Sequence, residues 1–201
     1  EILNIRWIST GVVELDELIE SANSTGIPGG GFPTRKITEI YGKKGIGKSS
    51  LMVRMAPAMG GKVLYIDAEN ALFGTNISDN VTVVPEPILE NVEAIVAEAL
   101  DINEYDIIVV DSVASLVCQT EIDGDIGQAH VGLKARLMHQ WIRRVTPHLM
   151  NSNTALVFIN QERVTLGLYA TKYTPGGTAL DFGSTLRIEL STTSKDKIVK
   201  G

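Results

Sequence analysis

The residues best suited to chemistry form a glycine-rich stretch, residues 42–49, that reads Gly-Lys-Lys-Gly-Ile-Gly-Lys-Ser. This is a complete G-x-x-x-x-G-K-[ST] pattern, in which backbone N–H groups converge on phosphate oxygens. Lys48 is expected to contact the β- and γ-phosphates of a nucleotide, and the Ser49 hydroxyl to ligate Mg²⁺. We therefore predict a phosphate site made of the whole loop: Gly42, Lys43, Lys44, Gly45, Ile46, Gly47, Lys48 and Ser49.

Acidic residues follow two apolar runs that read as buried strands. Asp111 ends the strand predicted over residues 107–110, so its carboxylate is expected at the strand's carboxyl end, where it would hold the hydrated Mg²⁺. Asp67 and Glu69 follow the strand predicted over residues 63–66. One of these two carboxylates is suited to activate the attacking water, and their spacing alone does not choose between them.

A polar triplet, Asn160-Gln161-Glu162, follows the strand predicted over residues 155–159. A strand-end amide that faces a γ-phosphate can report its presence through a hydrogen bond that hydrolysis removes. Gln161 is therefore a candidate nucleotide sensor, although the residues by themselves favour an ordinary turn.

These residues need a sheet to bring them together, and the hydrophobic pattern predicts one. Short apolar strands alternate with amphipathic helices, which indicates an α/β fold with a mainly parallel sheet flanked by helices on both faces. The segment 184–190 alternates polar and apolar residues and suits a half-exposed strand near a sheet edge. The predicted central strands are 37–41, 63–66, 81–84, 107–110 and 155–159, and the predicted helices are 48–59, 88–101 and 131–150.

Composition limits the class of protein. The chain has 201 residues, 44% of them hydrophobic, and its longest apolar runs hold roughly five residues, against the ~20 of a membrane helix. We therefore expect a globular protein with no membrane partner. A single cysteine, Cys118, forms no internal disulfide and agrees with a reducing, cytoplasmic location.

The charge is unevenly distributed along the chain. The formal net charge is −6, which by itself argues against nucleic-acid binding. Residues 129–180, however, carry six basic side chains and one acid, so this segment is at +5 and the rest of the chain at −11. Such asymmetry is compatible with one polyanion-binding side, or with chance variation of helix surfaces.

Several segments share their residues and their order with one known family. They are Asp111-Ser-Val-Ala-Ser-Leu, Glu121-Ile-Asp-Gly-Asp-Ile-Gly, Gly132-Leu-Lys-Ala-Arg-Leu-Met138, Phe158-Ile-Asn-Gln161 and Gly176-Gly-Thr-Ala-Leu180. Over about residues 7–190 the chain closely resembles the core of the bacterial RecA recombinases, including phage members. The resemblance implies a RecA-type P-loop NTPase core: a twisted, mainly parallel sheet with an antiparallel edge.

The resemblance also implies a domain organisation. Residues 1–201 would form a single ATPase core domain, with residues 1–33 as an N-terminal lead-in. The family's N-terminal polymerisation helix and C-terminal domain are expected to lie outside this sequence. Residues 120–129 would be a first DNA loop, and residues 162–177 a second.

Site roles follow from the same resemblance. Glu69 and Lys48 would be the catalytic residues of ATP hydrolysis, Ser49 and Asp111 the Mg²⁺ ligands, and Gln161 the nucleotide sensor, while Asp67 would be structural. Phe182 would take part in communication between neighbouring subunits. The implied DNA-binding residues are Arg136, Arg143, Arg163, Lys172, Gly176 and Gly177.

The function implied by the resemblance is a DNA-dependent ATPase that forms a helical homo-oligomeric filament on single-stranded DNA and exchanges strands with double-stranded DNA. Such a protein would act in DNA recombination, in DNA repair and in the SOS response to DNA damage. Two alternatives are a hexameric DNA motor ATPase with the same fold and a non-catalytic recombinase paralogue. The second alternative draws on departures from the family pattern: Lys44 stands where an acid is usual, and Phe73 and Asn76 replace residues that contact adenine.

Overall fold

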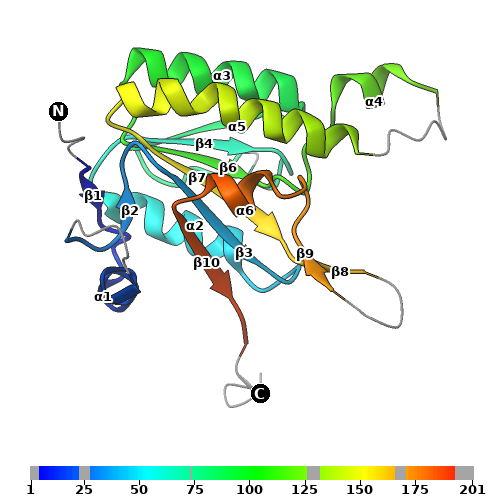
Figure 1. Ribbon diagram of the computed structural model, residues 1–201. Helices are drawn as coiled ribbons and strands as arrows, with labels where there is room; N and C mark the ends of the chain where they lie inside the picture. The colour runs from blue at the N-terminus through cyan, green and yellow to red at the C-terminus, as the bar shows by residue number, and fades with distance from the viewer. Residues whose placement is uncertain (1–4, 23–27, 73, 126–131, 166–170, 193–201) are drawn as a thin grey trace.

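A six-stranded parallel sheet forms the centre of the computed structural model, which describes residues 5–22, 28–72, 74–125, 132–165 and 171–192 (Figure 1). The strand order is β10-β3-β7-β6-β4-β5, and every neighbouring pair is parallel. The strands are β3 (Ile37–Gly42), β4 (Val63–Asp67), β5 (Val81–Pro85), β6 (Ile107–Asp111), β7 (Ala155–Gln161) and β10 (Leu186–Leu190).

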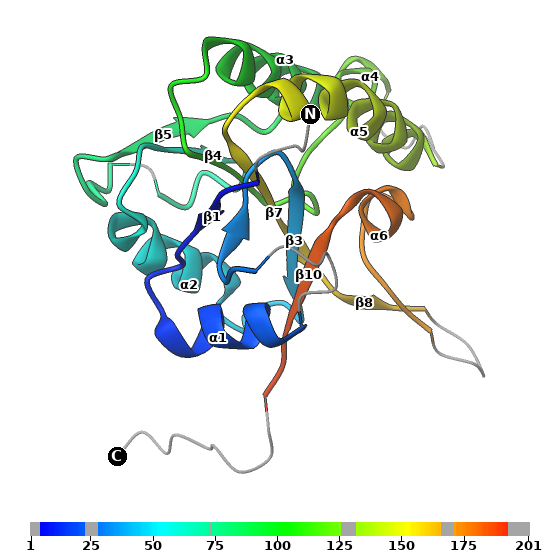
Figure 2. The ribbon, with the colours of Figure 1, turned by 60° about the vertical axis from the view of Figure 1, so that its left-hand side comes forward.

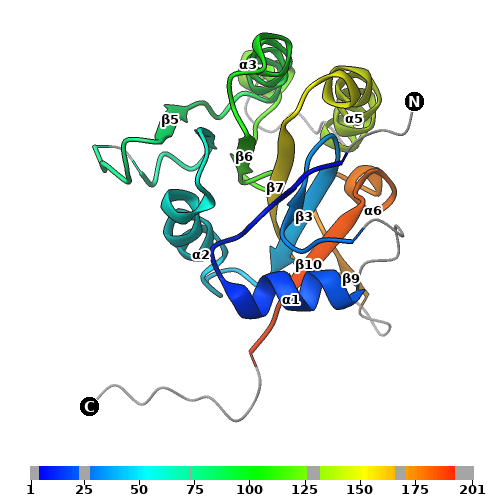
Figure 3. The same ribbon diagram turned by 90° about the vertical axis from the view of Figure 1, so that its left-hand side faces the viewer.

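Helices cover both faces of this sheet, as Figure 3 shows. On one face lie α2 (Lys48–Met55), its 3-10 continuation (Ala56–Met59) and α1 (Val13–Ala22). On the other lie α3 (Leu89–Ile102), α5 (Leu133–Asn151) and α6 (Ala179–Gly183). Because side chains alternate along each strand, Ile108 and Val110 pack under α3 and α5 while Ile107 and Val109 pack toward α2.

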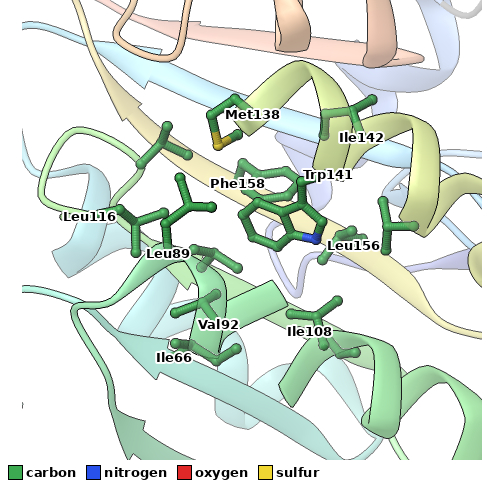
Figure 4. Close-up of a cluster of buried hydrophobic side chains, with 14 of the residues drawn as sticks. Ile66, Leu89, Val92, Ile108, Leu116, Met138, Trp141, Ile142, Leu156 and Phe158 are labelled. Atoms are coloured by element: carbon green, nitrogen blue, oxygen red, sulfur yellow. The ribbon is translucent and has the colours of Figure 1, made fainter. Parts of the chain in front are cut away.

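The core between the sheet and the α3/α5 layer is built around two aromatic rings (Figure 4). Trp141 of α5 meets Phe158 of β7 edge-on, with ring centroids 5.1 Å apart, and neither side chain is exposed. Edge-to-face pairs of this kind add to the stabilisation from apolar burial. The contact therefore fixes α5 on the strand that ends at Gln161.

The structure confirms the predicted fold class and all six predicted strands. The predicted helix 48–59 becomes α-helix and then 3-10 helix, since Pro57 lacks the N–H that a continuing α-helix requires. The predicted antiparallel edge is not found in the main sheet of the described chain, where the edge strand β10 runs parallel to β3. Antiparallel pairing occurs in two small sheets, β1 (Trp7–Ile8) with β2 (Phe32–Pro33) and β8 (Arg163–Val164) with β9 (Lys172–Tyr173).

Three helices of the described residues were not predicted from the sequence: α1, within the lead-in, the short α4 (Gln119–Asp123), which overlaps the predicted first DNA loop, and the short α6 (Ala179–Gly183). Across the described ranges, no helix is both long enough and apolar enough to cross a bilayer.

Candidate functional site

The predicted chemical residues meet at one edge of the main sheet. Because the strands are parallel, β3, β4, β6 and β7 all end on the same side, with Gly42 opposite Gln161 and Asp67 opposite Asp111. A cavity of about 300 Å³ opens there. Its lining includes most of the predicted phosphate loop together with Glu69, Asp111 and Gln161.

The phosphate loop connects β3 to α2 in the conformation that the motif predicts. Gly45 and Gly47 have φ angles of 77° and 99°, which residues with a side chain rarely adopt. Lys48 begins α2 with its side chain buried, and its Nζ donates hydrogen bonds to the carbonyl oxygens of Gly42 (3.0 Å) and Lys43 (2.9 Å). The helix N-terminus, the loop's backbone N–H groups and the lysine are the elements that a phosphate site requires.

Burial sets the electrostatics of this lysine. It lowers the pKa of Lys48, while the nearby carboxylates of Asp111 and Glu69 act in the opposite direction. A phosphate group in the cavity would supply the negative charge that favours the protonated ammonium.

Asp111 is buried at the end of β6, close to the phosphate loop. Its Oδ2 accepts a hydrogen bond from the hydroxyl of Tyr65, whereas its Oδ1 is buried without a partner among the described residues. Burial raises the pKa of Asp111, and the hydroxyls of Tyr65 and Ser49 partly offset this. An orphaned carboxylate oxygen beside a serine hydroxyl fits Mg²⁺, which is usually held by one or two protein oxygens, water and substrate phosphates.

Glu69 lies across the cavity at the centre of a hydrogen-bond network. Its Oε1 accepts hydrogen bonds from Ser115 Oγ (2.7 Å), Ser112 Oγ (2.9 Å) and Gln161 Nε2 (3.3 Å). Partial burial alone raises the pKa of Glu69, but these three donors and the charge of Lys44 together bring it below its ordinary value. Glu69 is therefore an ionised, oriented carboxylate at neutral pH, as a base that accepts a proton from water must be.

The two candidate carboxylates at the end of β4, Asp67 and Glu69, differ in environment. Asp67 is buried, and its side chain accepts hydrogen bonds from the backbone N–H groups of Glu69 (3.2 Å) and Leu72 (2.7 Å). Asp67 thus holds the turn that presents Glu69 to the cavity.

Sequence reasoning missed three members of the site, Ser112, Ser115 and Tyr65. Ser115 stands four residues after Asp111, on the turn that follows β6, and Tyr65 is the one aromatic residue in β4. The sequence shows that each residue carries a hydroxyl group close to a strand end. Its spacing does not indicate which carboxylate that hydroxyl would bind.

The comparison with known families agrees with this geometry. The family model of the RecA N-terminal domain matches residues 1–200. The chain belongs to the RecA family.

Three RecA relatives show the extent of the likeness. Protein RecA of Leptospira meyeri is 39% identical over 198 residues, covering 91% of this chain and 48% of the relative. Protein RecA of Clostridium perfringens is 40% identical over 198 residues (91% and 53%), and that of Pseudomonas fluorescens is 38% identical over 205 residues (94% and 55%). The chain spans about half the length of these relatives, and the RecA core it matches is a nucleotide-binding ATPase fold.

Three of the basic residues expected to meet DNA are exposed and form no ion pair within the described part of this RecA-family chain. Arg136 and Arg143 lie seven residues apart on α5, hence on the same side of the helix, and both are exposed. Arg163 is exposed in β8. None of the three forms an ion pair with another described residue, whereas Arg144 is paired with Glu93 at 3.2 Å.

Lys172, the fourth predicted DNA-binding cation, is already engaged. Its Nζ lies 3.0 Å from the carboxylate of Glu162 and 3.5 Å from that of Glu189. The Glu162 side chain is only 4% exposed, so Lys172 neutralises a carboxylate that is largely shielded from water. The pair joins β9 to the residue directly after Gln161.

The glycine pair of the predicted second loop packs against α5. Gly176 is buried, and a Cβ added to Gly177 would lie 2.9 Å from the Cβ of Ala135. The ring of Phe182 on α6 is 85% exposed, as a residue that meets another subunit must be. Residues 126–129 of the first loop, 166–170 of the second, and Phe73 lie outside the described residues.

Both predicted DNA loops extend from the cavity side of the molecule. In Figures 1 and 2, α4 and the β8/β9 hairpin project from the same side, α4 beside the start of α5 and the hairpin beyond the end of β7. The cavity lies at the carboxyl edge of the sheet, where β7 ends shortly before this hairpin.

Proposed function

We propose that this chain is the single-domain ATPase core of a DNA recombinase. The protein binds ATP with Mg²⁺, forms a helical filament on single-stranded DNA, and pairs and exchanges that strand with homologous double-stranded DNA during recombination and repair. ATP hydrolysis is stimulated by DNA and releases the DNA-binding state.

One observation carries this proposal: Gln161 connects the cavity to the second predicted DNA loop. Its amide hydrogen-bonds Glu69 in the cavity, and β8 begins only two residues later. The loss of a γ-phosphate at this position can therefore change the path of the hairpin. Such a link supports an ATPase whose turnover depends on DNA.

Different residues of the cavity have different roles in ATP hydrolysis. The phosphate loop and Lys48 bind and orient the triphosphate, and Glu69 accepts the proton of the attacking water. Ser49 and Asp111 would hold Mg²⁺, which supplies charge neutralisation to the phosphates when bound. The bound nucleotide is ATP, as the family resemblance implies.

The free arginines support DNA binding without sequence preference. Arg136, Arg143 and Arg163 can each meet a phosphate, and phosphate contacts carry no sequence information. Strand exchange requires this property, because base pairing must select the homologous sequence. Lys172, Gly176 and Gly177 complete the proposed DNA-binding set.

Assembly follows from the same proposal. The exposed Phe182 supports a contact between successive subunits of the filament, and its 85% exposure leaves it available for one. We place the reaction in the cytoplasm, in line with the single buried thiol of Cys118.

The test is ATP turnover with and without single-stranded DNA over a salt series. Wild-type turnover is expected to rise with DNA and to lose this stimulation steeply with salt. Lys48→Ala and Glu69→Ala should each lower DNA-stimulated turnover by a factor on the order of 100 or more. The matched controls are Lys62→Ala and Glu98→Ala, which remove the same charges from exposed positions away from the cavity.

Filament formation needs a second measurement. Electron microscopy with a slowly hydrolysed ATP analogue and single-stranded DNA should reveal open helical filaments, and strand-exchange assays should yield joint molecules. If the protein forms closed rings instead of filaments, it is a hexameric motor and this proposal is wrong. If it forms filaments but exchanges no strands, it is a non-catalytic recombinase paralogue.

A further inference from the structure

Among the described residues, two lysines line the cavity, and they differ in burial and in hydrogen bonding. Lys48 is buried and donates both of its recorded hydrogen bonds to the phosphate loop's own carbonyl groups. Lys44 is exposed and makes no ion pair or side-chain hydrogen bond with any described residue. Among the described residues, Lys44 is therefore the lysine of the cavity whose ammonium group does not hold the phosphate loop in place.

The position of Lys44 relative to its neighbours indicates which part of the cavity it serves. The adjacent Lys43 lines a separate hollow of about 120 Å³, together with Glu162 and Lys172. Lys44 instead shares the main cavity with Glu69 and Gln161, and its positive charge helps to lower the pKa of Glu69. Lys44 thus adds positive charge to the cavity that it lines together with the proposed base and the proposed sensor.

We propose that Lys44 is a further catalytic residue, which stabilises the negative charge on the γ-phosphoryl group in the transition state of hydrolysis. This inference rests on the proposed ATPase function. It assigns to the phosphate loop itself, within one subunit, the cation that many phosphoryl-transfer enzymes receive from an arginine in cis or in trans.

The reaction step balances without a further reactant. The oxygen of water forms a bond to the γ-phosphorus as the bond from that phosphorus to the bridging β–γ oxygen breaks. The electron pair of the broken bond stays on the β-phosphate of ADP, and a proton of the water passes to the Glu69 carboxylate. Lys44 neither gains nor loses a proton, because its role is to stabilise charge on the equatorial oxygens.

This role predicts that Lys44 affects the rate more than ATP binding. Ground-state affinity comes mainly from the loop's backbone N–H groups and from Lys48, whereas Lys44 faces the group whose charge distribution changes during reaction. Because Lys44 is exposed, its removal leaves no cavity in the core. A loss of rate is therefore not expected to reflect loss of folding.

The experiment compares Lys44→Ala, Lys44→Arg and wild type in single-turnover hydrolysis at saturating ATP with DNA present. Lys44→Ala is expected to lower this rate by about 100- to 1,000-fold, the range for removal of one preorganised charge-stabilising group, and to change the Kd for ATP by less than about threefold. Lys44→Arg should recover most of the rate. The affinity for ADP with aluminium fluoride, a transition-state analogue, should fall in Lys44→Ala far more than the affinity for ADP alone.

Arg54→Ala is the matched control, because it removes one positive charge from an exposed position on α2, outside the cavity. Its hydrolysis rate is expected to equal that of wild type. An unchanged rate in Lys44→Ala, or an effect on ATP affinity alone, would overturn the role of Lys44 while leaving the ATPase function intact. A wild-type protein that does not hydrolyse ATP would instead overturn the proposed function. The catalytic role of Lys44, which rests on that function, would then be overturned with it.

Discussion

The shortest hydrogen bond to the Glu69 carboxylate comes from Ser115, at 2.7 Å, and not from the sensor amide of Gln161, at 3.3 Å. Ser115 also lies 3.1 Å from Ser112, so the two hydroxyls orient one another as well as the carboxylate. If Glu69 is the proposed base, these hydrogen bonds orient its carboxylate and favour its ionised form without a bound nucleotide.

Replacing Ser115 with alanine removes one donor to this carboxylate. The pKa of Glu69 should rise, because hydrogen bonds that stabilise the ionised form lower it. A base works only when ionised, so the acidic limb of the kcat–pH profile should move to higher pH. We also expect kcat at neutral pH to fall on the order of tenfold, the effect of one hydrogen bond to a charged group.

Ser21→Ala on α1 is the control for this variant, since the Ser21 hydroxyl bonds only to the carbonyl of Leu18 among the described residues. An acidic limb that stays in place in Ser115→Ala would mean that Ser115 does not influence the base.

At the scale of elements, the pair formed by Lys172 and Glu162 ties the β8/β9 hairpin to the end of β7. The same lysine was predicted to bind DNA. A lysine held by a largely buried carboxylate must leave that partner before it can meet a phosphate, so the carboxylate and DNA compete for one cation.

Glu162→Gln removes this competition while nearly preserving the shape of the side chain. Single-stranded DNA should bind more tightly, and the plot of log affinity against log salt should become steeper by ~0.7 if one further phosphate is neutralised. Fluorescence anisotropy over a salt series measures both effects. Glu189→Gln should change them less, because Glu189 is farther from Lys172 and more exposed; an unchanged slope in Glu162→Gln would show that Lys172 does not reach DNA.

The packing of α5 on β7 gives a prediction about stability. Trp141→Ala removes a fully buried ring and its edge-on contact with Phe158, which should lower the free energy of unfolding by about 3–5 kcal/mol. Trp141→Phe retains most of the contact and should cost less. Denaturant unfolding followed by circular dichroism measures the free energy of unfolding of both variants. If Trp141→Ala and Trp141→Phe lower it equally, the edge-on aromatic contact does not stabilise the protein.

At the scale of the whole molecule, the net charge of −6 conceals a separation between acidic and basic regions. The structure refines the +5 of residues 129–180, because Arg144 and Lys172 are paired and Lys134 donates to the carbonyl of Ala114. The cations that remain free are those on the exposed side of α5 and on β8.

This distribution predicts how the protein responds to salt. The double variant Arg136→Gln/Arg143→Gln should weaken binding of single-stranded DNA to a similar extent for all sequences and reduce the salt slope by about 1.4, which is about 0.7 for each lost phosphate contact. DNA-independent ATP turnover should be retained. The neighbouring Arg144→Gln is the control, because Arg144 is paired with Glu93; a similar loss of slope in this control would indicate a general charge effect.

Features that depend on local sequence patterns were predicted correctly, whereas contacts between residues far apart in the sequence were not. Strand alternation and the phosphate-loop motif are local signals, and they located all six strands and the edge at which Lys48, Asp111 and Gln161 meet. The antiparallel edge implied by the family resemblance is not found in the main sheet of the described residues, because the pairing of β10 with β3 is a long-range choice that an alternating pattern does not encode. The partners of Tyr65, Ser115 and Lys172 were missed for the same reason: each contact joins segments far apart in sequence or across a loop.

The parallel sheet has a practical consequence for labelling the protein. Its carboxyl edge bears the cavity and the predicted loops, whereas its amino edge is formed by turns that lead into strands, such as the one between α5 and β7. A fluorophore attached at the amino edge would lie a full strand's length away from the cavity and from the ends of the strands that lead into the predicted loops. Single-molecule reporters of filament growth can therefore be placed at that edge with little risk of disturbing the reaction they observe.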